Sequence, residues 1–243
     1  MIRKKSVDII LPVYYGNLRE LEESIKTQVR TYKLILKDYK WSIVISINGK
    51  DADKIIDLSK KLSRSYRNVK YLYTEFAGKG YGVINGWSKS KADIRVYMDI
   101  DLSVDLKCLP ELIRKIELGY DISIGSRYHK DSRVKRGFKR KLISMIYHLL
   151  LIKIILGAKY KDVQCGFKAI NKRVPEIFDL VKDRKWFFET EFLYIAQKKG
   201  FKIIDVPVIW NESKFSSINL LKVVPEFFIK MIKLRFRKLW FIN

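Results

Sequence analysis

The chain has 243 residues, of which 48% are hydrophobic and 13% aromatic, and 50 Lys and Arg against 26 Asp and Glu give a net charge of +24. This apolar and aromatic content excludes a disordered basic tail, which lacks the residues needed to bury a core. A single α/β domain of this size is common, and no stretch rich in Gly, Ser or Pro divides the chain. The charge must face a negative partner: a nucleic acid, an anionic small substrate or a membrane surface.

Cysteines and apolar runs narrow the cellular setting. Cys108 and Cys165 are too few for a disulfide framework and lack the spacing of a zinc site, so we expect buried small side chains in a reducing compartment. The apolar run after the basic N-terminus is interrupted by Asp8 and Pro12, which argues against a signal peptide. No run of about 18 uncharged apolar residues occurs, so no helix is expected to span a bilayer unaided; residues 142–156 come nearest.

Hydrophobic periodicity predicts strands and helices that alternate along the first 125 residues. Short apolar runs bounded by turn residues predict buried strands, and apolar residues at three-to-four spacing predict helices. In chain order the predicted elements are strand 7–14, helix 18–36, strand 41–47, helix 52–62, strand 69–73, helix 81–90, strand 94–100, helix 109–118 and strand 121–125. This order predicts an α/β fold, a mostly parallel sheet with helices on both faces, whose ligands bind beyond the carboxyl ends of the strands.

Two acidic residues follow the fourth predicted strand. Asp99 and Asp101 stand two positions apart, so in an extended segment their side chains point to the same face and can converge on one hard cation. Alone, an Asp-x-Asp pair is a weak signal that also occurs on exposed loops. Its position directly after a buried strand favours a metal site.

Glycine and basic residues follow the third and fifth predicted strands. Gly78-Lys79-Gly80 opens a helix, where backbone N–H groups, the lysine charge and the helix N-terminus all favour a phosphate; the alternative is a flexible turn with a solvated lysine. Arg127 follows the fifth strand and can grip a diphosphate with two hydrogen bonds. Together with the aspartates, these residues predict a site for a metal-bound nucleotide.

The order of these motifs resembles glycosyltransferase family 2, with its Rossmann-like GT-A fold. The resemblance rests on Pro12-Val13-Tyr14, Gly78-Lys79-Gly80, Asp99-x-Asp101, Gly125-Ser126-Arg127 and Gln164-Cys165-Gly166-Phe167-Lys168, and covers residues 6–240. Within the family the chain is most similar to the polyprenyl-phosphate hexosyltransferases, especially the dolichyl-phosphate glucosyltransferase type. That similarity extends through residues 186–196 and Val206-Pro207-Val208-x-Trp210.

The resemblance implies roles for particular residues. Asp99, Asp101 and Glu191 are the expected catalytic residues, with Glu191 close to the reacting sugar. Asp101, assisted by Asp99, is expected to bind a Mg²⁺ or Mn²⁺ ion that bridges the diphosphate. The residues expected to bind the nucleotide sugar are Pro12, Tyr14, Asn48, Lys79, Gly80, Asp99 and Arg127. The candidates for holding an acceptor phosphate are Arg127, Arg133, Arg136, Arg140, Lys168 and Lys214.

Basic residues also flank apolar segments in the second half of the chain. A basic loop at 127–141 precedes the apolar segment 142–152, a junction that suits a ligand with an anionic head and a hydrocarbon tail; the alternative is a solvated loop before a core helix. We expect an interfacial helix at about 140–156 within a catalytic domain of residues 1–213.

The C-terminal segment, 214–243, is predicted to be an amphipathic helix that associates with a membrane. Its polar residues fall at helical spacing on one stripe, its other face is apolar, and Pro225 is expected to start or kink it. A helix packed on the protein's own core has a similar pattern. The polar stripe comprises Asn219, Lys222, Glu226, Lys230, Lys233 and Arg237.

These patterns predict a metal-dependent, inverting hexosyltransferase. It is expected to move a sugar from a donor such as UDP-glucose or GDP-mannose to a polyprenyl phosphate at the cytoplasmic face of a membrane, bound peripherally. One alternative keeps the fold and transfers to a saccharide hydroxyl, with Glu191 or Asp162 as base. Another is a non-enzymatic basic binding module. Nucleic-acid binding is disfavoured, because it predicts one continuous basic face and gives no reason for acidic pairs at strand ends.

Overall fold

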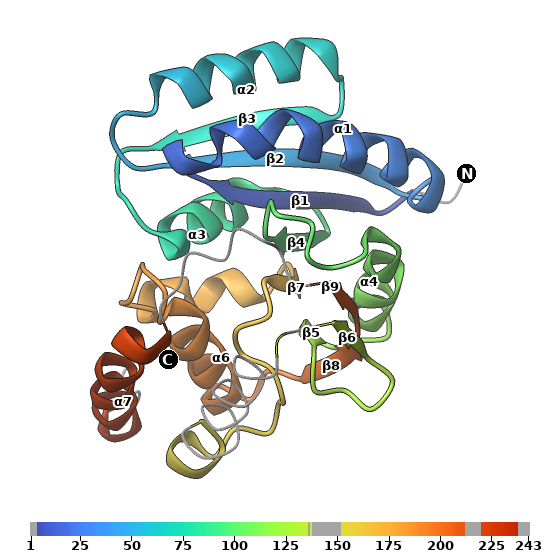
Figure 1. Ribbon diagram of the computed structural model, residues 1–243. Coiled ribbons are helices and arrows are strands. Elements are labelled where there is room, and N and C mark those ends of the chain that lie inside the picture. The colour runs from blue at the N-terminus through green and yellow to red at the C-terminus, as the bar shows by residue number, and fades with distance from the viewer. Residues whose placement is uncertain (1–3, 136, 138–151, 212–219, 238–243) are drawn as a thin grey trace.

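The computed structural model describes residues 4–135, 137, 152–211 and 220–237 (Figure 1). Seven strands form one sheet in the order β3-β2-β1-β4-β7-β5-β8, and β6 pairs with β9 beside it. The strands are β1 (Ser6–Val13), β2 (Lys40–Asn48), β3 (Val69–Thr74), β4 (Ile94–Met98), β5 (Ile122–Ser126), β6 (Arg133–Lys135), β7 (Phe167–Asn171), β8 (Ile203–Pro207) and β9 (Ile209–Asn211). The predicted mostly parallel sheet is confirmed, with β7 antiparallel to both of its neighbours.

Helices cover both faces of the sheet, as predicted. They are α1 (Leu18–Ile35), α2 (Asp53–Ser65), α3 (Lys79–Lys89), α4 (Leu109–Glu117), α6 (Phe188–Lys198) and α7 (Leu220–Phe236), with short 3₁₀ helices η1 (Tyr15–Asn17), η2 (Leu106–Cys108) and η4 (Val174–Leu180). In Figure 1, α1 and α2 lie on one side of the β1–β3 part of the sheet and α3 lies on the other. No described helix is long and apolar enough to cross a membrane.

Successive side chains of β1 point to opposite faces of the sheet and contribute to a hydrophobic core on each face. Ile9 and Leu11 point into a core that they share with α1, α2 and α4, and Ile10 points into a second core formed with α3, α6 and α7. Because both faces are buried, this strand is almost continuously apolar in sequence. The polar side chains of the site therefore lie at the ends of the strands rather than along them.

The strand order places a topological switch between β1 and β4. The chain runs from β1 outward to β3 and then returns to the other side of β1. β1 pairs with β2 as far as Val13, but its pairing with β4 ends at Ile10. Pro12, which has no N–H to donate, therefore lies where the β4 side of β1 has no partner strand. Ligands of open α/β sheets bind at such switch points.

Two differences from the predicted elements bear on the site. The predicted strand 94–100 ends at Met98, because the chain turns at Ile100 and Asp101, where the Ser24 hydroxyl donates a hydrogen bond of 2.8 Å to the Ile100 carbonyl oxygen. The second is β7, which lies between β4 and β5; like β6, α6, β8 and β9, it follows the last of the elements predicted from periodicity.

The C-terminal helix has two apolar faces. Phe227, Met231 and Leu234 are buried in the second core, so α7 packs on the domain. On the opposite side, the outer stripe of α7 comprises Phe228, Ile229, Ile232 and Phe236, which are all exposed. Pro225 lies inside the helix rather than at its start. Within the predicted interfacial helix 140–156, only residues 152–156 are described.

A Gly86→Ala substitution tests the close packing of α3 on β1. A Cβ at Gly86 would lie 2.8 Å from Cγ1 of Ile10, closer than real contacts allow. We expect the variant to lose about 1–3 kcal/mol of unfolding free energy in urea denaturation, despite the better helix propensity of alanine. Ser88→Ala, on the exposed side of the same helix, should be neutral or slightly stabilising; equal effects of the two substitutions would contradict this packing.

Candidate functional site

Polar residues gather at the carboxyl ends of the parallel strands, around the switch between β1 and β4. Asp99 follows β4, Asn48 ends β2, and Lys79 begins α3. β7 also reaches this edge, because an antiparallel strand begins where its parallel neighbours end; its Phe167 is paired with Met98. The strand topology thus brings residues far apart in sequence to one place.

Gly166 makes room for the carboxylate of Asp99. The Asp99 N–H donates to the Gly166 carbonyl oxygen at 2.9 Å, and a Cβ at Gly166 would overlap the Asp99 side chain. Any other residue at position 166 would therefore displace the carboxylate. This close approach gives a physical reason for the glycine in the Gln164–Lys168 motif.

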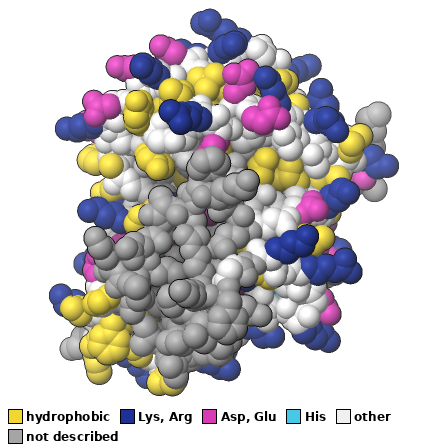
Figure 2. Space-filling view, in the orientation of Figure 1, with side chains coloured by type: hydrophobic (Ala, Val, Ile, Leu, Met, Phe, Trp, Pro, Cys, Tyr) yellow, Lys and Arg dark blue, Asp and Glu magenta, His cyan; other side chains and the backbone are white. Residues whose placement is uncertain are grey.

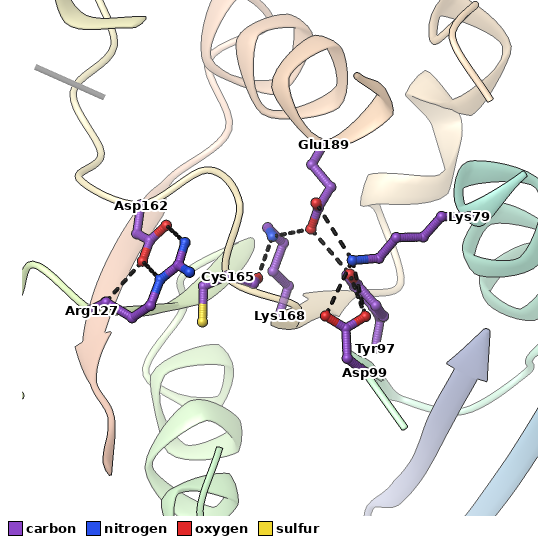
Figure 3. A network of polar contacts seen from close by, with 8 residues as sticks. All are labelled: Lys79, Tyr97, Asp99, Arg127, Asp162, Cys165, Lys168 and Glu189. Carbon is purple, nitrogen blue, oxygen red and sulfur yellow. Dashed lines mark hydrogen bonds and ion pairs between the residues drawn. The ribbon is translucent and has the colours of Figure 1, made fainter. Parts of the chain in front are cut away.

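Lys79 lies between two acidic residues, as Figure 3 shows. Its Nζ is 2.9 Å from Oδ1 of Asp99 and 3.8 Å from Oε2 of Glu189. Burial lowers the pKa of Lys79, but these carboxylates outweigh it and leave the pKa above its ordinary value. The ammonium group thus stays charged and joins the strand-end aspartate to α6.

Tyr97 and Lys168 complete the network. The Tyr97 hydroxyl is 3.2 Å from Oδ1 of Asp99 and 3.1 Å from Oε1 of Glu189. Lys168 Nζ donates to Oε1 of Glu189 and to the Cys165 carbonyl oxygen, both at 2.6 Å. The side chains of Lys168 and Glu189 are each only 1% exposed, so this ion pair is shielded from water.

Burial and charge shift the pKa values of the acidic residues in opposite directions. Burial raises the pKa of Glu189, but Lys168 and Lys79 outweigh it, so the net shift is downward and Glu189 stays ionised. The pKa of Asp99 is raised, mainly by burial and further by the charges of Asp101 and Glu189, although Lys79 opposes the shift. The neighbouring carboxylates thus add to the effect of burial at Asp99.

Asp101 is held in the turn after β4. Its carboxylate accepts hydrogen bonds from the Ser103 N–H at 3.0 Å and the Ser103 hydroxyl at 2.7 Å. The next residue, Leu102, has a φ of 53°, a conformation that costs energy for a non-glycine residue and is often found at functional sites. The prediction that Asp99 and Asp101 lie in an extended segment is therefore wrong, because the chain turns between them.

These two carboxylates fit a divalent cation in part. Among the described residues, no group of three or more His, Cys, Asp or Glu side chains gathers to hold a metal. Burial is the main cause of the raised pKa of Asp99, and the charge of Asp101 adds to it, so a cation held by both carboxylates would offset both effects. Hard carboxylate oxygens suit Mg²⁺ or Mn²⁺, whose remaining ligands can come from phosphates and water.

Asn48 fixes the glycine loop to the end of β1. Its Nδ2 donates to the Val13 carbonyl oxygen at 2.8 Å, and its Oδ1 accepts from the Gly78 N–H at 3.0 Å. Gly78 has a φ of 147°, which favours glycine. Within the site, Asn48 therefore positions the loop that carries Lys79.

Arg127 is engaged within the protein. Its Nε and Nη2 donate to the two carboxylate oxygens of Asp162 at 2.8 Å, and its backbone N–H donates to Asp162 at 2.9 Å. The guanidinium group also lies 4.8 Å from the ring centre of Trp210. The pair of hydrogen bonds that Arg127 is expected to make to a diphosphate is thus made to the buried carboxylate of Asp162.

Glu191 is not part of the Asp99 network. Its carboxylate accepts from the N–H groups of Lys182 and Asp183 and pairs with Arg237 of α7. Residues two apart on a helix point about 200° apart, so α6 directs Glu189, rather than Glu191, toward Asp99. The sequence signal for Glu189 was present in the Glu189-Thr190-Glu191 motif, but which carboxylate faces the site depends on packing.

The remaining predicted site residues are distributed around the network. Tyr14 is half-exposed after β1, and Gly80 lies against residues 184–188. Arg133 is exposed on β6, and Lys168 is fully buried rather than open to an acceptor. Three further predicted acceptor-phosphate residues, Arg136, Arg140 and Lys214, lie outside the described residues.

The fold is that of known nucleotide-sugar glycosyltransferases of the GT-A type. The glucosyl-3-phosphoglycerate synthase from Mycobacterium tuberculosis, solved with Mn²⁺, UDP-glucose and phosphoglyceric acid, superposes with a TM-score of 0.64 at 14% identity, covering 95% of this chain and 79% of that one. At this identity the likeness establishes the fold.

The chain belongs to glycosyl transferase family 2, whose family model matches residues 8–178. It is 28% identical over 249 residues to a dolichyl-phosphate β-glucosyltransferase of Dictyostelium discoideum (96% of this chain, 75% of that protein). It is 31% identical over 206 residues to a dolichol-phosphate mannosyltransferase of Pyrococcus furiosus (83% and 55%) and 29% identical over 219 residues to glycosyltransferase AglD of Haloferax volcanii (89% and 35%). The chain thus spans about a third to three quarters of these relatives, and the resemblance found in the sequence is confirmed.

A Glu189→Gln substitution tests the buried ion pair. It would leave the Lys168 charge buried without its counter-charge, so we expect a loss of about 3–5 kcal/mol of unfolding free energy in urea denaturation. Glu176→Gln, at an exposed position on η4, should have little effect. Replacing Lys168 and Glu189 together by Met should recover most of the loss; if the double variant is as unstable as Glu189→Gln, the unpaired charge is not the cause.

Proposed function

We propose that the chain transfers a hexosyl group from a nucleotide sugar to a polyprenyl phosphate at a membrane surface, in a reaction that requires a divalent cation. The observation that carries the proposal is the carboxylate pair Asp99 and Asp101 beside Lys79 at the carboxyl edge of a GT-A sheet. The named relatives, dolichyl-phosphate glucosyltransferase and dolichol-phosphate mannosyltransferase, support this class of acceptor. The structural relative solved with Mn²⁺ and UDP-glucose supports the donor class and the metal.

The chain's own residues would contribute mainly position and charge. Asp99 and Asp101 would hold the cation, which when bound supplies the positive charge that offsets negative charge growing on the leaving diphosphate. Gly166, Tyr97 and Lys79 keep the Asp99 carboxylate in place. An oxygen of the acceptor phosphate would bond to the anomeric carbon as the bond to the nucleoside diphosphate breaks, which inverts the configuration in one displacement.

The surroundings of the other carboxylates favour a phosphate over a hydroxyl as acceptor. A hydroxyl acceptor needs a general base within hydrogen-bond reach. Asp162 is fully buried and bonded to Arg127, and Glu191 is bonded to two backbone N–H groups and Arg237. An acceptor phosphate is already ionised near neutral pH and needs no such base.

The outer stripe of α7 supports a membrane surface as partner. It presents four exposed apolar side chains next to the exposed basic residues Lys233 and Arg235, a pattern typical of interfacial helices. Hydrophobic side chains gather in the lower left of the face in Figure 2, where Figure 1 places α7. Basic residues beside such a stripe add attraction to anionic lipids.

A transfer assay with purified protein, anionic vesicles containing polyprenyl phosphate, and labelled UDP-glucose or GDP-mannose tests the reaction. We expect label in a mild-acid-labile lipid, dependent on Mg²⁺ or Mn²⁺. Asp101→Asn should lower the rate at least about 100-fold, because it removes a carboxylate from the cation site. Asp57→Asn, on the exposed surface of α2, should leave the rate unchanged. Absence of label from the lipid fraction with both donors would contradict the lipid acceptor, and label transferred to an added oligosaccharide instead would favour the hydroxyl acceptor.

Paired substitution of Phe228 and Ile232 by Ser tests the membrane contact. Each side chain lost from the lipid should weaken binding by roughly tenfold, so the pair should lower the affinity for anionic vesicles by about 100-fold, measured by sedimentation over a range of lipid concentrations. Point variants are preferable to removing α7, because Phe227, Met231 and Leu234 belong to the core. Leu34→Ser, an exposed leucine on α1, should sediment like the unaltered protein; undiminished sedimentation of the Phe228 and Ile232 variant would exclude this stripe as the contact.

A further inference from the structure

The segment 182–187, between η4 and α6, contacts the glycine loop of the site. The Tyr81 N–H at the start of α3 donates to the Arg184 carbonyl oxygen at 3.1 Å. A Cβ at Gly80 would lie 2.8 Å from that same carbonyl oxygen, so the loop and the segment touch through their backbones. A shift of the segment must therefore move the start of α3.

The same segment contacts Lys79 through a side chain. Nζ of Lys79 lies 5.4 Å from the ring centre of Trp186 and 5.2 Å from that of Tyr97, so the ammonium group lies close to both rings. Trp186 is 40% exposed, whereas the Lys79 side chain is 12% exposed. The position of Trp186 thus helps to set where the Lys79 charge lies relative to Asp99.

On its other side, the segment is held by α7. Nζ of Lys230 lies 2.7 Å from Oδ2 of Asp183, and the rings of Phe227 and Phe187 pack edge to face at 5.3 Å. Burial lowers the pKa of Lys230, but its carboxylate partners outweigh this, so it remains charged. The polar side of α7 therefore faces the domain at this point.

A second ion pair holds the beginning of the segment. Arg237, just after α7, pairs with Glu191 and donates to the Leu180 carbonyl oxygen at 2.6 Å. Glu191 in turn accepts from the N–H groups of Lys182, at 3.0 Å, and Asp183, at 2.6 Å. Two residues of the predicted polar stripe, Lys230 and Arg237, are thus used inside the protein.

We propose that Asp183 and Glu191 are positioning residues through which α7 sets the donor-diphosphate side of the site, so that nucleotide affinity depends on the docking of α7. The contacts run from Lys230 and Arg237 through residues 182–187 to the Gly78-Lys79-Gly80 loop. This inference rests on the proposed function, because it takes that loop to be part of the donor site. It assigns Glu191 a role that acts through other residues rather than on the sugar.

The test measures the affinity of the full chain for UDP and for GDP, each with Mn²⁺, by titration calorimetry. Lys230→Met removes the charge, both from the ion pair with Asp183 and from the contact of Nζ with the Phe187 ring, and keeps an unbranched apolar side chain; we expect the dissociation constant to rise about fivefold or more. Lys230→Arg should retain the affinity, and Lys233→Met, an exposed position on the same helix, should not change it. Lys230→Met should still sediment with anionic vesicles, because the outer stripe lies on another side of α7.

Each result separates the two proposals. Binding of neither nucleotide by the unaltered chain would overturn the proposed function. Binding by the unaltered chain with equal affinity in Lys230→Met would overturn only the coupling. If Lys230→Met unfolds, Asp183→Asn is the second variant, because its amide oxygen can still accept from the Lys185 N–H while the ion pair is weakened; unchanged affinity there would overturn the coupling as well.

Discussion

Lys168 and Glu189 bring opposite charges into a part of the protein that water does not reach. Removing both from water is costly, and the cost is offset only while the two groups stay in contact and their other hydrogen bonds are made. The pair therefore constrains β7 and α6 to one relative position. Tyr97 on β4 is held to the same Glu189 oxygen, and Lys79 at the start of α3 lies close to the other. Four elements thus meet at one carboxylate, and the position of Asp99 depends on all of them.

The antiparallel direction of β7 is the second constraint on the site. A parallel strand at this place in the sheet would carry its first residues to the far edge, away from Asp99. Because β7 runs the other way, Gly166 lies under the Asp99 carboxylate and Lys168 lies opposite Tyr97 in the ladder. The strand direction is therefore as important to the site as the side chains of the Cys165 motif. Gly166 leaves space for the Asp99 carboxylate, and Lys168 supplies the positive charge that pairs with Glu189 of α6.

The sequence could predict what depends on local pattern and on the geometry of parallel sheets. The alternating elements follow from periodicity, and Asp99 and Lys79 follow from their places after buried strands, which necessarily share an edge. Three things depend on packing between distant segments and could not be predicted in this way. Glu189 and Glu191 stand on one short helix with the same chemistry, and only the positions of Lys168 and Arg237 decide which faces the site. Arg127 has a carboxylate partner 35 residues away. The strand β7 lies between two strands that precede it in the chain.

The amphipathic pattern of the C-terminal helix is compatible both with packing on the protein core and with contact with a membrane. A helix that only packs on a core needs one apolar face, and a helix that only lies on a membrane needs one as well. In α7 the buried residues Phe227 and Met231 and the exposed residues Phe228 and Ile232 are each four apart, so they form two separate stripes. Between them on one flank stand Lys230 and Arg237, whose charges are neutralised by the domain. These two basic residues are thus paired inside the protein and contribute nothing to the net charge of +24, which is carried by basic residues that have no acidic counterpart. A contact at the outer stripe and the docking of the inner one can then exist together, because they use different sides of the same helix.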